Sequence, residues 1–413
     1  MVIEIMTELE NLKKEWESIF SCMGCGECGF AINPMVGIDL TCPVKEALGE
    51  KAFEIHFSRG RMSVLKSILE GSIPLSKELA EFVYQCTECG NCTETCHQSD
   101  ENVVLNISKW IDHCKVWNAL RKDLVDAGFA PLERHESLIE WLNNENMKNP
   151  YGEQQVKKYE WISAFPNIKE KGELIFFGGC TMPLRQENTL KNMMKILQVA
   201  GIEVAVSRDE WCCGSIGLRI GKSGEEIIKR NVDLLNKMGA KTVFTACAGC
   251  YRTLKKDYPE ILGEELPFEV KHITEILIDL LNNDKIPFKP PEDEELKVTY
   301  HDPCHLGRHM DFYEIPRNVI EKIPSVKLIE MKRNRNHAWC CGAGGGVKSQ
   351  YPDMAKDISK ERIKEAIESG ADILTTSCPF CIGNLKDAYD EMSQEVKEKI
   401  FLIDIIDLIA SKI

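Results

Sequence analysis

The arrangement of the cysteines constrains this chain more than any other feature of its sequence. The chain has 413 residues and 19 cysteines. Residues 1–20 carry Glu4, Glu8, Glu10 and Glu15 and lack the apolar stretch of a secretory signal, so we expect a cytoplasmic protein. Because a reducing compartment keeps thiols from forming structural disulfides, metal binding or redox chemistry is the usual reason for so many cysteines.

The N-terminal region contains two runs of closely spaced cysteines. Each run has C-x2-C-x2-C spacing and is followed by one further cysteine: Cys22, Cys25, Cys28 and then Cys42; Cys86, Cys89, Cys92 and then Cys96. In this cubane-cluster signature, three neighbouring thiolates bind one four-iron cluster and the fourth cysteine binds the other cluster. We therefore expect two cubane 4Fe-4S sites, one from Cys22, Cys25, Cys28 and Cys96 and one from Cys86, Cys89, Cys92 and Cys42.

This pattern resembles a two-cluster ferredoxin domain, with two departures. Residues 29–41 are inserted before Cys42-Pro43, and His97 stands where proline usually follows the fourth cysteine. Paired C-x2-C units also bind zinc tetrahedrally, so a zinc ribbon is the alternative. Three cysteines in each run favour iron and sulfide.

The remainder of the chain alternates short apolar runs with amphipathic stretches, which predicts an α/β fold with helices covering parallel or mixed sheets. Polar stretches at 143–152 and 287–295 are typical of linkers. We therefore expect an α-helical two-cluster ferredoxin domain over residues 1–150, followed by α/β domains over 173–286 and 296–413.

The two C-terminal domains are an internal duplication. Trp211-Cys212-Cys213-Gly214 recurs as Trp339-Cys340-Cys341-Gly342, and the runs that begin at Gly239 and Gly370 also match. Five cysteines recur in each copy: Cys180, Cys212, Cys213, Cys247 and Cys250; Cys304, Cys340, Cys341, Cys378 and Cys381. We name these the first set and the second set.

Five thiolates are one too many for tetrahedral zinc, and soft thiolates in this number suit an iron–sulfur assembly. The glycines at 214 and 217 and at 342–346 would let the backbone approach a cluster and direct N–H groups at it. Buried structural cysteines are the alternative, but such cysteines usually occur singly.

The repeated spacing of Cys, Cys-Cys-Gly and C-x-x-C resembles the cysteine-rich CCG domain of heterodisulfide reductases. A ferredoxin domain fused in front is similar to the D subunit of that family, and all but one of the 19 cysteines occupy family positions. Residues 58–62 also resemble the family's connecting segment. The resemblance implies two non-cubane four-iron clusters, one in each set, facing the mixed disulfide of coenzyme M and coenzyme B. Cys212, Cys213, Cys340 and Cys341 would then take part in catalysis.

Cleavage of a disulfide also needs protons. By resemblance to the family's second cluster site we expect His305 to supply one, since histidine exchanges protons near neutral pH. A hydrogen bond from His305, His301 or His309 that only tunes the cluster is the alternative. Arg308 is a candidate for binding an anionic substrate group, and Cys114 matches no motif.

Two other functions remain open. The same architecture occurs in electron-transfer subunits of flavin-dependent lactate, glycolate or glycerol 3-phosphate dehydrogenases, although completeness of both cysteine sets favours disulfide reduction. A zinc-stabilised scaffold or thiol sensor without turnover is the third interpretation.

Partner expectations follow from what the sequence lacks. No glycine-rich dinucleotide fingerprint follows a strand, so we expect no flavin or NAD on this chain and an electron donor that is a membrane cytochrome, a flavoprotein or a hydrogenase-linked subunit. A formal charge of −14 argues against nucleic acid. The apolar stretch 401–413 could be a surface anchor, but it repeats a mid-chain stretch near Ile273, which favours a core helix. Association with a membrane would then be peripheral, through a partner subunit.

Overall fold

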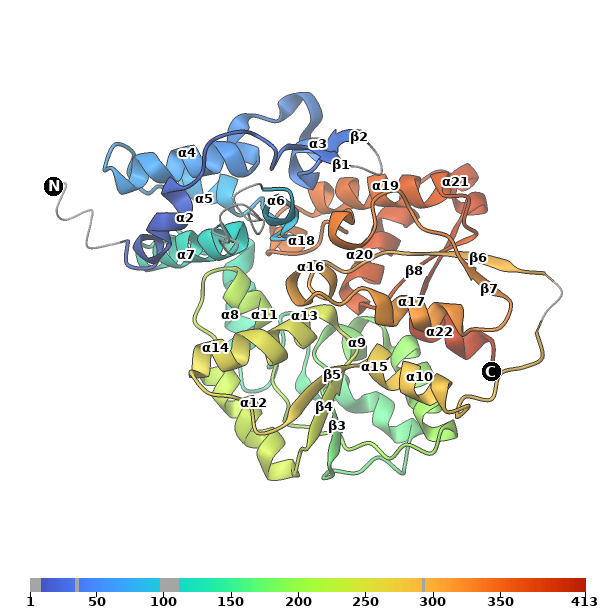
Figure 1. The fold of residues 1–413 in the computed structure, drawn as a ribbon. Helices are drawn as coiled ribbons and strands as arrows, with labels where there is room; N and C mark the ends of the chain where they lie inside the picture. Colours follow the sequence, from blue (N-terminus) through green and yellow to red (C-terminus); the bar gives the residue numbers. More distant parts are fainter. Residues whose placement is uncertain (1–8, 34–36, 97–110, 292–293) are drawn as a thin grey trace, which may run out of the picture. The chain divides into compact units, whose positions relative to one another are not determined.

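The computed structural model describes residues 9–33, 37–96, 111–291 and 294–413 (Figure 1). His97 therefore lies outside the described residues. The chain forms two compact units, each assembled from separate segments. The first unit comprises residues 1–136, 216–223 and 335–361, and the second comprises 137–215, 224–334 and 362–413.

The first unit is mainly helical. Its two longest helices are α4 (Ser58–Leu69) and α7 (His113–Asp126), which bury Met62, Leu65 and Trp117 among other apolar residues. Shorter elements surround them: η1 (Leu12–Glu15), α2 (Trp16–Phe20), α3 (Pro43–Leu48), η2 (Gly49–Lys51), η3 (Glu54–His56), α5 (Lys77–Val83), α6 (Asn91–Glu94), η6 (Arg335–His337) and α18 (Val347–Gln350). The predicted insertion at 29–41 is an antiparallel pair of strands, β1 (Phe30–Asn33) and β2 (Gly37–Leu40).

The second unit contains two parallel sheets. One has the order β3-β4-β5, and the other has the order β7-β6-β8-β9. The strands are β3 (Leu174–Phe176), β4 (Thr242–Thr245), β5 (Glu269–His272), β6 (Leu296–Tyr300), β7 (Val326–Leu328), β8 (Ile373–Thr376) and β9 (Phe401–Asp404). A parallel bridge between Ile175 and Ala205 takes the place of β7 in the first copy. The two sheets thus confirm the predicted α/β duplication.

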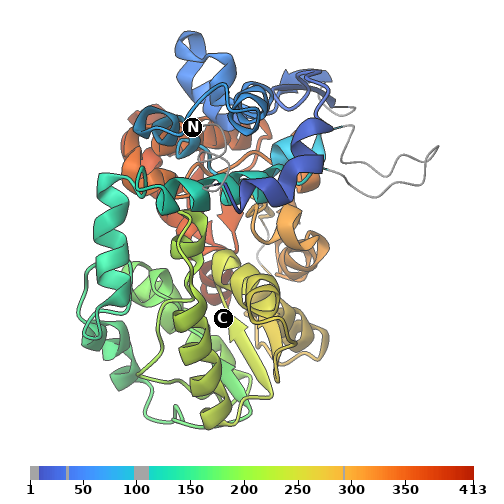
Figure 2. The ribbon, with the colours of Figure 1, turned by 90° about the vertical axis from the view of Figure 1, so that its left-hand side faces the viewer.

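Helices flank the sheets. In Figures 1 and 2, α12 (Glu225–Met238) and α14 (Tyr258–Leu262) lie on one side of the sheet β3–β5. The other helices of this unit are η4 (Gln155–Ala164), α9 (Thr181–Arg185), α13 (Ala248–Arg252), η5 (Thr253–Asp257), α16 (Gly307–Met310), α20 (Pro379–Asp390) and α21 (Gln394–Lys399). Apart from Ser215, α11 (Ser215–Arg219) belongs to the first unit, and α8 (Glu133–Asn143) and α19 (Pro352–Glu368) contain residues of both units.

Four further helices join the two copies into one core. Helix α10 (Glu187–Val199) packs on α22 (Ile405–Ser411), and α15 (Ile273–Asn282) packs on α17 (Glu314–Glu321). Because α10 corresponds to α17 and α15 to α22 in the duplication, these two contacts are equivalent. Their apolar residues belong to a single buried cluster, so each copy covers an apolar face of the other.

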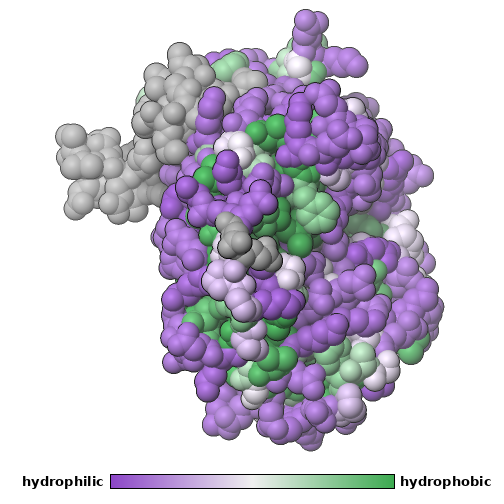
Figure 3. All heavy atoms as spheres, turned by 90° about the vertical axis from the view of Figure 1, so that its right-hand side faces the viewer, coloured by the Kyte–Doolittle hydropathy of each residue, from purple (hydrophilic) through white to green (hydrophobic). Residues whose placement is uncertain are grey.

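Helix α22 lies in the apolar stretch 401–413, for which the sequence left a surface anchor and a core helix as alternatives. Its residues Ile405, Ile406, Leu408 and Ile409 are buried, which confirms the core helix. Among the helices in the described ranges, none has the length and apolarity to cross a bilayer. On the face drawn in Figure 3, hydrophilic side chains predominate and hydrophobic ones form small separate patches.

Candidate functional site

Two cavities in the first unit collect the N-terminal cysteines. One is lined by Cys22, Cys25, Cys28 and Cys96, together with Arg59 and His113. The other is lined by Cys42, Cys86, Cys89 and Cys92, together with Arg61 and Cys114. The fourth cysteine of each run therefore lines the cavity formed by the other run.

Burial controls the ionisation of these thiols. It raises the pKa of Cys28 to about 12 and that of Cys42 to about 11. The Arg61 guanidinium partly offsets the effect at Cys42. Metal ligands must be thiolates, so metal binding at these sites releases protons. Arg61 is itself fixed by donating to the carbonyls of Ile55, His56 and Phe82.

The cysteines of the two duplicated sets follow parallel strands. Cys180 follows β3 and Cys247 follows β4, while Cys304 and Cys378 follow β6 and β8. Because parallel strands end at the same sheet edge, this topology gathers side chains that are far apart in the sequence. Cys180, Cys247 and Cys378 occupy the N-cap positions of α9, α13 and α20.

The sulfurs of the first set form a continuous chain of contacts. All of these cysteines are free thiols, and hydrogen bonds connect them in series: Cys180 with Cys212, Cys212 with Cys213, Cys213 with Cys250, and Cys250 with Cys247. The pKa of Cys212 is lowered because Cys180 and Cys213 both donate to its sulfur, and that of Cys247 is lowered by Cys250 and Cys378. All five thiols therefore lie together at one point of the second unit.

The contact between Cys247 and Cys378 links the two sets. Cys378 also forms a hydrogen bond with Cys381, so the series of hydrogen-bonded thiols continues into the second copy. The pKa of Cys378 is raised to about 12, chiefly because its proton is shared with the Cys247 sulfur. First-set and second-set sulfurs are thus direct neighbours within the second unit.

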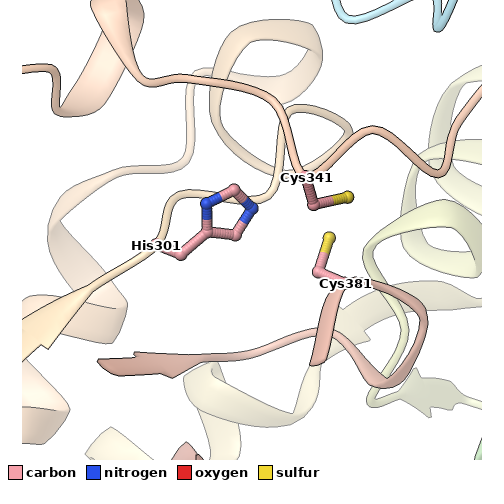
Figure 4. Close-up of side chains that lie close together, drawn as sticks. All are labelled: His301, Cys341 and Cys381. Carbon is pink, nitrogen blue, oxygen red and sulfur yellow. The ribbon is translucent and has the colours of Figure 1, made fainter. Parts of the chain in front are cut away.

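The remaining second-set cysteines divide between the units. Cys304 belongs to the second unit, whereas Cys340 and Cys341 belong to the first. There the backbone N–H of Gly342 donates to the sulfur of Cys340 at 3.2 Å, and the Ser359 hydroxyl donates to the carbonyl of Cys341 at 2.7 Å. Figure 4 draws Cys381 and His301 of the second unit. A ring nitrogen of His301 and the sulfur of Cys381 lie within 4.8 Å of each other.

Buried polar side chains hold the loops of the first set. The Glu210 carboxylate accepts from the backbone N–H groups of Gly178 and Gly179, each at 2.9 Å, just before Cys180. The Lys158 ammonium lies 2.8 Å from the same carboxylate and is fully buried. Asn231 donates to the carbonyl of Cys212 at 3.0 Å. The backbone around the thiols is therefore fixed by specific hydrogen bonds.

His305 lies next to the first set, although it follows Cys304 of the second. Its Nε2 is 3.3 Å from Nη1 of Arg252 in α13. A methyl group placed on Gly249 would be 3.8 Å from Nδ1 of His305 and 3.7 Å from the sulfur of Cys247. Because an arginine only donates, Nε2 accepts this bond and Nδ1 carries the proton. His309 contacts the ring of His305 edge-on.

The first set fits an iron–sulfur group. Its five donors are soft thiols, more than a tetrahedral zinc ion takes. Gly179 adjoins them with no side chain, and a Cβ there would lie 2.8 Å from the sulfur of Cys250. The glycines at 342–346 were expected to let the backbone approach a cluster. Two of them, Gly344 and Gly345, instead lie against the backbone of Cys86 and Thr87.

Several residues near the sulfurs were not predicted. His272 and Asp404 occupy the equivalent N-caps of α15 and α22, and both are buried near Cys378. Burial lowers the pKa of His272 to about 4 and raises that of Asp404. Their only signal in the sequence was their place before the repeated closing helices. Lys158, Glu210 and Arg252 gave none, because charged residues are usually exposed.

Comparisons with known proteins show which families the chain matches. Residues 18–99 match the 4Fe-4S dicluster domain family, and residues 174–255 and 298–386 each match the cysteine-rich domain family. A crystal structure of a hypothetical protein from Helicobacter pylori has a TM-score of 0.58 at 10% identity, covering 89% of this chain and 70% of that one, and thus shares the fold.

Two curated relatives span almost the whole chain. The EtfAB:quinone oxidoreductase of Syntrophomonas wolfei is 26% identical, covering 95% of this chain and 59% of its own. The D subunit of the dihydromethanophenazine:CoB–CoM heterodisulfide reductase of Methanosarcina barkeri is 38% identical, covering 94% of this chain and 93% of its own. With its dicluster domain and its duplicated cysteine-rich domains, the chain is an iron–sulfur oxidoreductase component that belongs to the D-subunit family of heterodisulfide reductases.

Proposed function

We propose that this chain is the catalytic subunit of a heterodisulfide reductase that reduces the mixed disulfide of coenzyme M and coenzyme B to two thiols. The observation that carries the proposal is the contact between Cys247 and Cys378, which brings the two sets together. Cleaving one S–S bond takes two electrons and two protons and leaves two sulfur atoms to be held. Two adjoining thiol-rich sites are suited to hold one sulfur each.

Each cysteine set would hold one non-cubane four-iron cluster, and each N-terminal cavity one cubane cluster. When bound, such clusters supply single electrons and iron atoms that bind sulfur. The ligands would be the five cysteines of each set and the four cysteines of each cavity. Glu210 and Asn231 would keep the thiolates of the first set in position by fixing the backbone on either side.

His305 would deliver a proton to the departing thiolate. Arg252 donates to Nε2, so the transferable proton lies on Nδ1, on the side of Gly249 and Cys247. A donor at this point can serve a sulfur bound next to the first set. Tuning of a cluster by the same N–H group is the competing role.

Electrons would enter through the first unit. The backbone of Gly344 and Gly345 contacts Cys86 and Thr87 at the edge of the second cavity, a few residues after Cys341. Arg121 ties these segments together by donating to the carbonyls of Cys86 and Gly345. A membrane cytochrome, a flavoprotein or a hydrogenase-linked subunit would be the donor. Attachment to a membrane would be peripheral, through that partner.

A second candidate function is electron transfer beside a flavin-dependent dehydrogenase. The likeness to the EtfAB:quinone oxidoreductase favours it, because that relative spans the same domains. In this function the two sets would carry electrons without binding a disulfide.

Anaerobic electron paramagnetic resonance separates the two candidates. We expect oxidised protein to give a new signal when coenzyme M or coenzyme B thiol is added. That signal should disappear in Cys247→Ser and Cys341→Ser, because thiol binding needs both intact sets. Full iron content without any thiol-dependent signal would instead support electron transfer, and zinc in place of iron would contradict both.

A further inference from the structure

The residue that follows the first strand differs in chemical type between the two copies of the duplicated domain. His301 and Phe177 both follow the first strand of their copy, and each donates its backbone N–H to the neighbouring strand: His301 to Thr375 at 2.7 Å and Phe177 to Phe244 at 2.8 Å. Both side chains are buried, with exposed fractions of 1% and 0%. The first copy thus has a purely apolar ring where the second copy has an imidazole.

A buried arginine determines where the proton of His301 lies. The Arg362 Nε–H donates to Nδ1 of His301 at 3.1 Å. Arg362 is fully buried and is oriented by the Arg333 carbonyl and the Glu365 carboxylate, each 2.8 Å from Nη1. Because a guanidinium has no lone pair to offer, Nδ1 must be the acceptor, and the ring proton is on Nε2.

The Nε2–H group faces the sulfur of Cys381. In Figure 4 the ring nitrogen farther from the backbone lies on the side of the ring where that sulfur is drawn, and a ring nitrogen of His301 lies within 4.8 Å of the sulfur. Among the residues that the structure describes, Nε2 has no hydrogen-bond partner. A buried N–H without a partner is costly, so this group is suited to an acceptor that arrives at the second set.

His301 is therefore poorly suited to bind a metal ion itself. A histidine that ligates through one nitrogen usually donates from the other nitrogen to a carboxylate or carbonyl. Here the partner of Nδ1 is a donor, which leaves Nε2 protonated and without a free lone pair. The ring can donate to a thiolate or sulfide but cannot replace a cysteine ligand.

We infer that the Nε2–H of His301 donates a hydrogen bond to a sulfur of the second-set cluster and thereby raises the reduction potential of that cluster. This inference rests on the proposed clusters. Adding an electron makes the sulfurs more negative, so a hydrogen bond from His301 stabilises the reduced form more than the oxidised form. Phe177 offers the first set no such bond at the equivalent position.

The test is a potentiometric titration of the full-length protein followed by electron paramagnetic resonance. The signals are assigned by losing one in Cys250→Ala and the other in Cys381→Ala. His301→Phe, which copies the first set, should lower the second-set midpoint potential and leave the first-set potential unchanged. His301→Gln keeps an N–H donor and should restore most of the potential. Phe177→Leu is the matched control in the first set and should leave the second-set midpoint unchanged.

Labelling histidine with ¹⁵N provides a readout that does not depend on the variants folding. A weakly coupled nitrogen and an exchangeable proton near the second-set cluster would support the hydrogen bond. A strongly coupled nitrogen would overturn it, since His301 would then be a ligand, and so would an unchanged midpoint in His301→Phe with full iron content. Wild-type protein that binds only the iron of the two cubane sites would instead refute the proposed function.

Discussion

At the scale of single residues, a buried ion pair holds the backbone next to the first set in position. Lys158 and Glu210 form a pair with side-chain exposures of 0% and 4%. Glu210 in turn fixes the loop before Cys180 through Gly178 and Gly179. Breaking such a pair leaves a buried charge without compensation, which is among the more damaging single changes.

We therefore expect Lys158→Met to destabilise the second unit by about 3–5 kcal/mol and to lower the iron content, because Cys180 loses its fixed position. The neighbouring Lys157 is 56% exposed and pairs with Glu153 at the surface, so Lys157→Met is the control. Thermal unfolding and iron analysis check both variants. Equal stability of the two variants would show that the buried pair contributes little.

Residues of this kind also mark what the sequence could not predict. The cysteines were recognisable because their types and spacings are specific to metal clusters. The polar residues that hold them, such as Asn231 and Arg362, have types that are common on surfaces. His301 was named with His305 and His309 as a candidate donor of a hydrogen bond to the cluster, but its contact with Arg362 could not be predicted, because the two residues lie 61 positions apart in the sequence.

At the scale of secondary-structure elements, the turns after the strands decide where the thiols lie. Gly179 precedes helix α9 with a φ of +64°, a conformation that glycine adopts without strain. A side chain there would also meet the sulfur of Cys250 at 2.8 Å. Gly201, after α10, has a similar φ of +76° but nothing within 4 Å of its Cβ position.

These two glycines give a matched pair of variants. Gly201→Ala should cost about 1 kcal/mol from backbone strain alone and leave the iron content unchanged. Gly179→Ala should cost more and should also reduce the iron bound by the first set, because the new methyl group displaces the Cys250 sulfur. Unfolding midpoints and iron per chain measure the two effects. Loss of iron from Gly201→Ala would mean that strain, and not contact with Cys250, is responsible.

The elements themselves were largely predictable. The alternation of short apolar runs with amphipathic stretches indicated parallel sheets covered by helices, and the duplication supported each copy with the other. The strands in the insertion at 29–41 were not foreseen, since their pairing depends on backbone hydrogen bonds and not on a strong apolar pattern.

At the scale of the whole molecule, connections between distant segments matter most. The four apolar helices α10, α15, α17 and α22 bring both copies into one core. In the first unit, each cavity draws on both cysteine runs. The sequence indicated the crossing in the first unit through cluster chemistry, but it could not show that the first unit also includes residues 216–223 and 335–361.

Because each cavity contains one cysteine that follows the other run, substituting that cysteine should affect the cluster of the cavity that contains it. Cys96→Ser should remove the cluster proposed for Cys22, Cys25 and Cys28 and leave the cluster proposed for the second cavity in place, because Cys96 lines the first cavity. Cys42→Ser should do the reverse. Cys114 lines the second cavity as an additional thiol, so Cys114→Ala is the control and should keep both clusters.

Iron per chain and low-temperature spectra of the reduced variants distinguish these outcomes. If Cys96→Ser instead removed the cluster held by Cys86, Cys89 and Cys92, the crossing would be wrong. If Cys114→Ala lost a cluster, Cys114 would have to be counted among the ligands.

The same crossing constrains how the protein can be made. During translation, the thiols at 22, 25 and 28 leave the ribosome about seventy residues before Cys96, their fourth companion in the cavity. A nascent chain that stops short of Cys96 therefore has three of the four cysteines of this cavity and cannot complete its lining. The full set of four cysteines in either cavity is therefore available only after both runs have been synthesised.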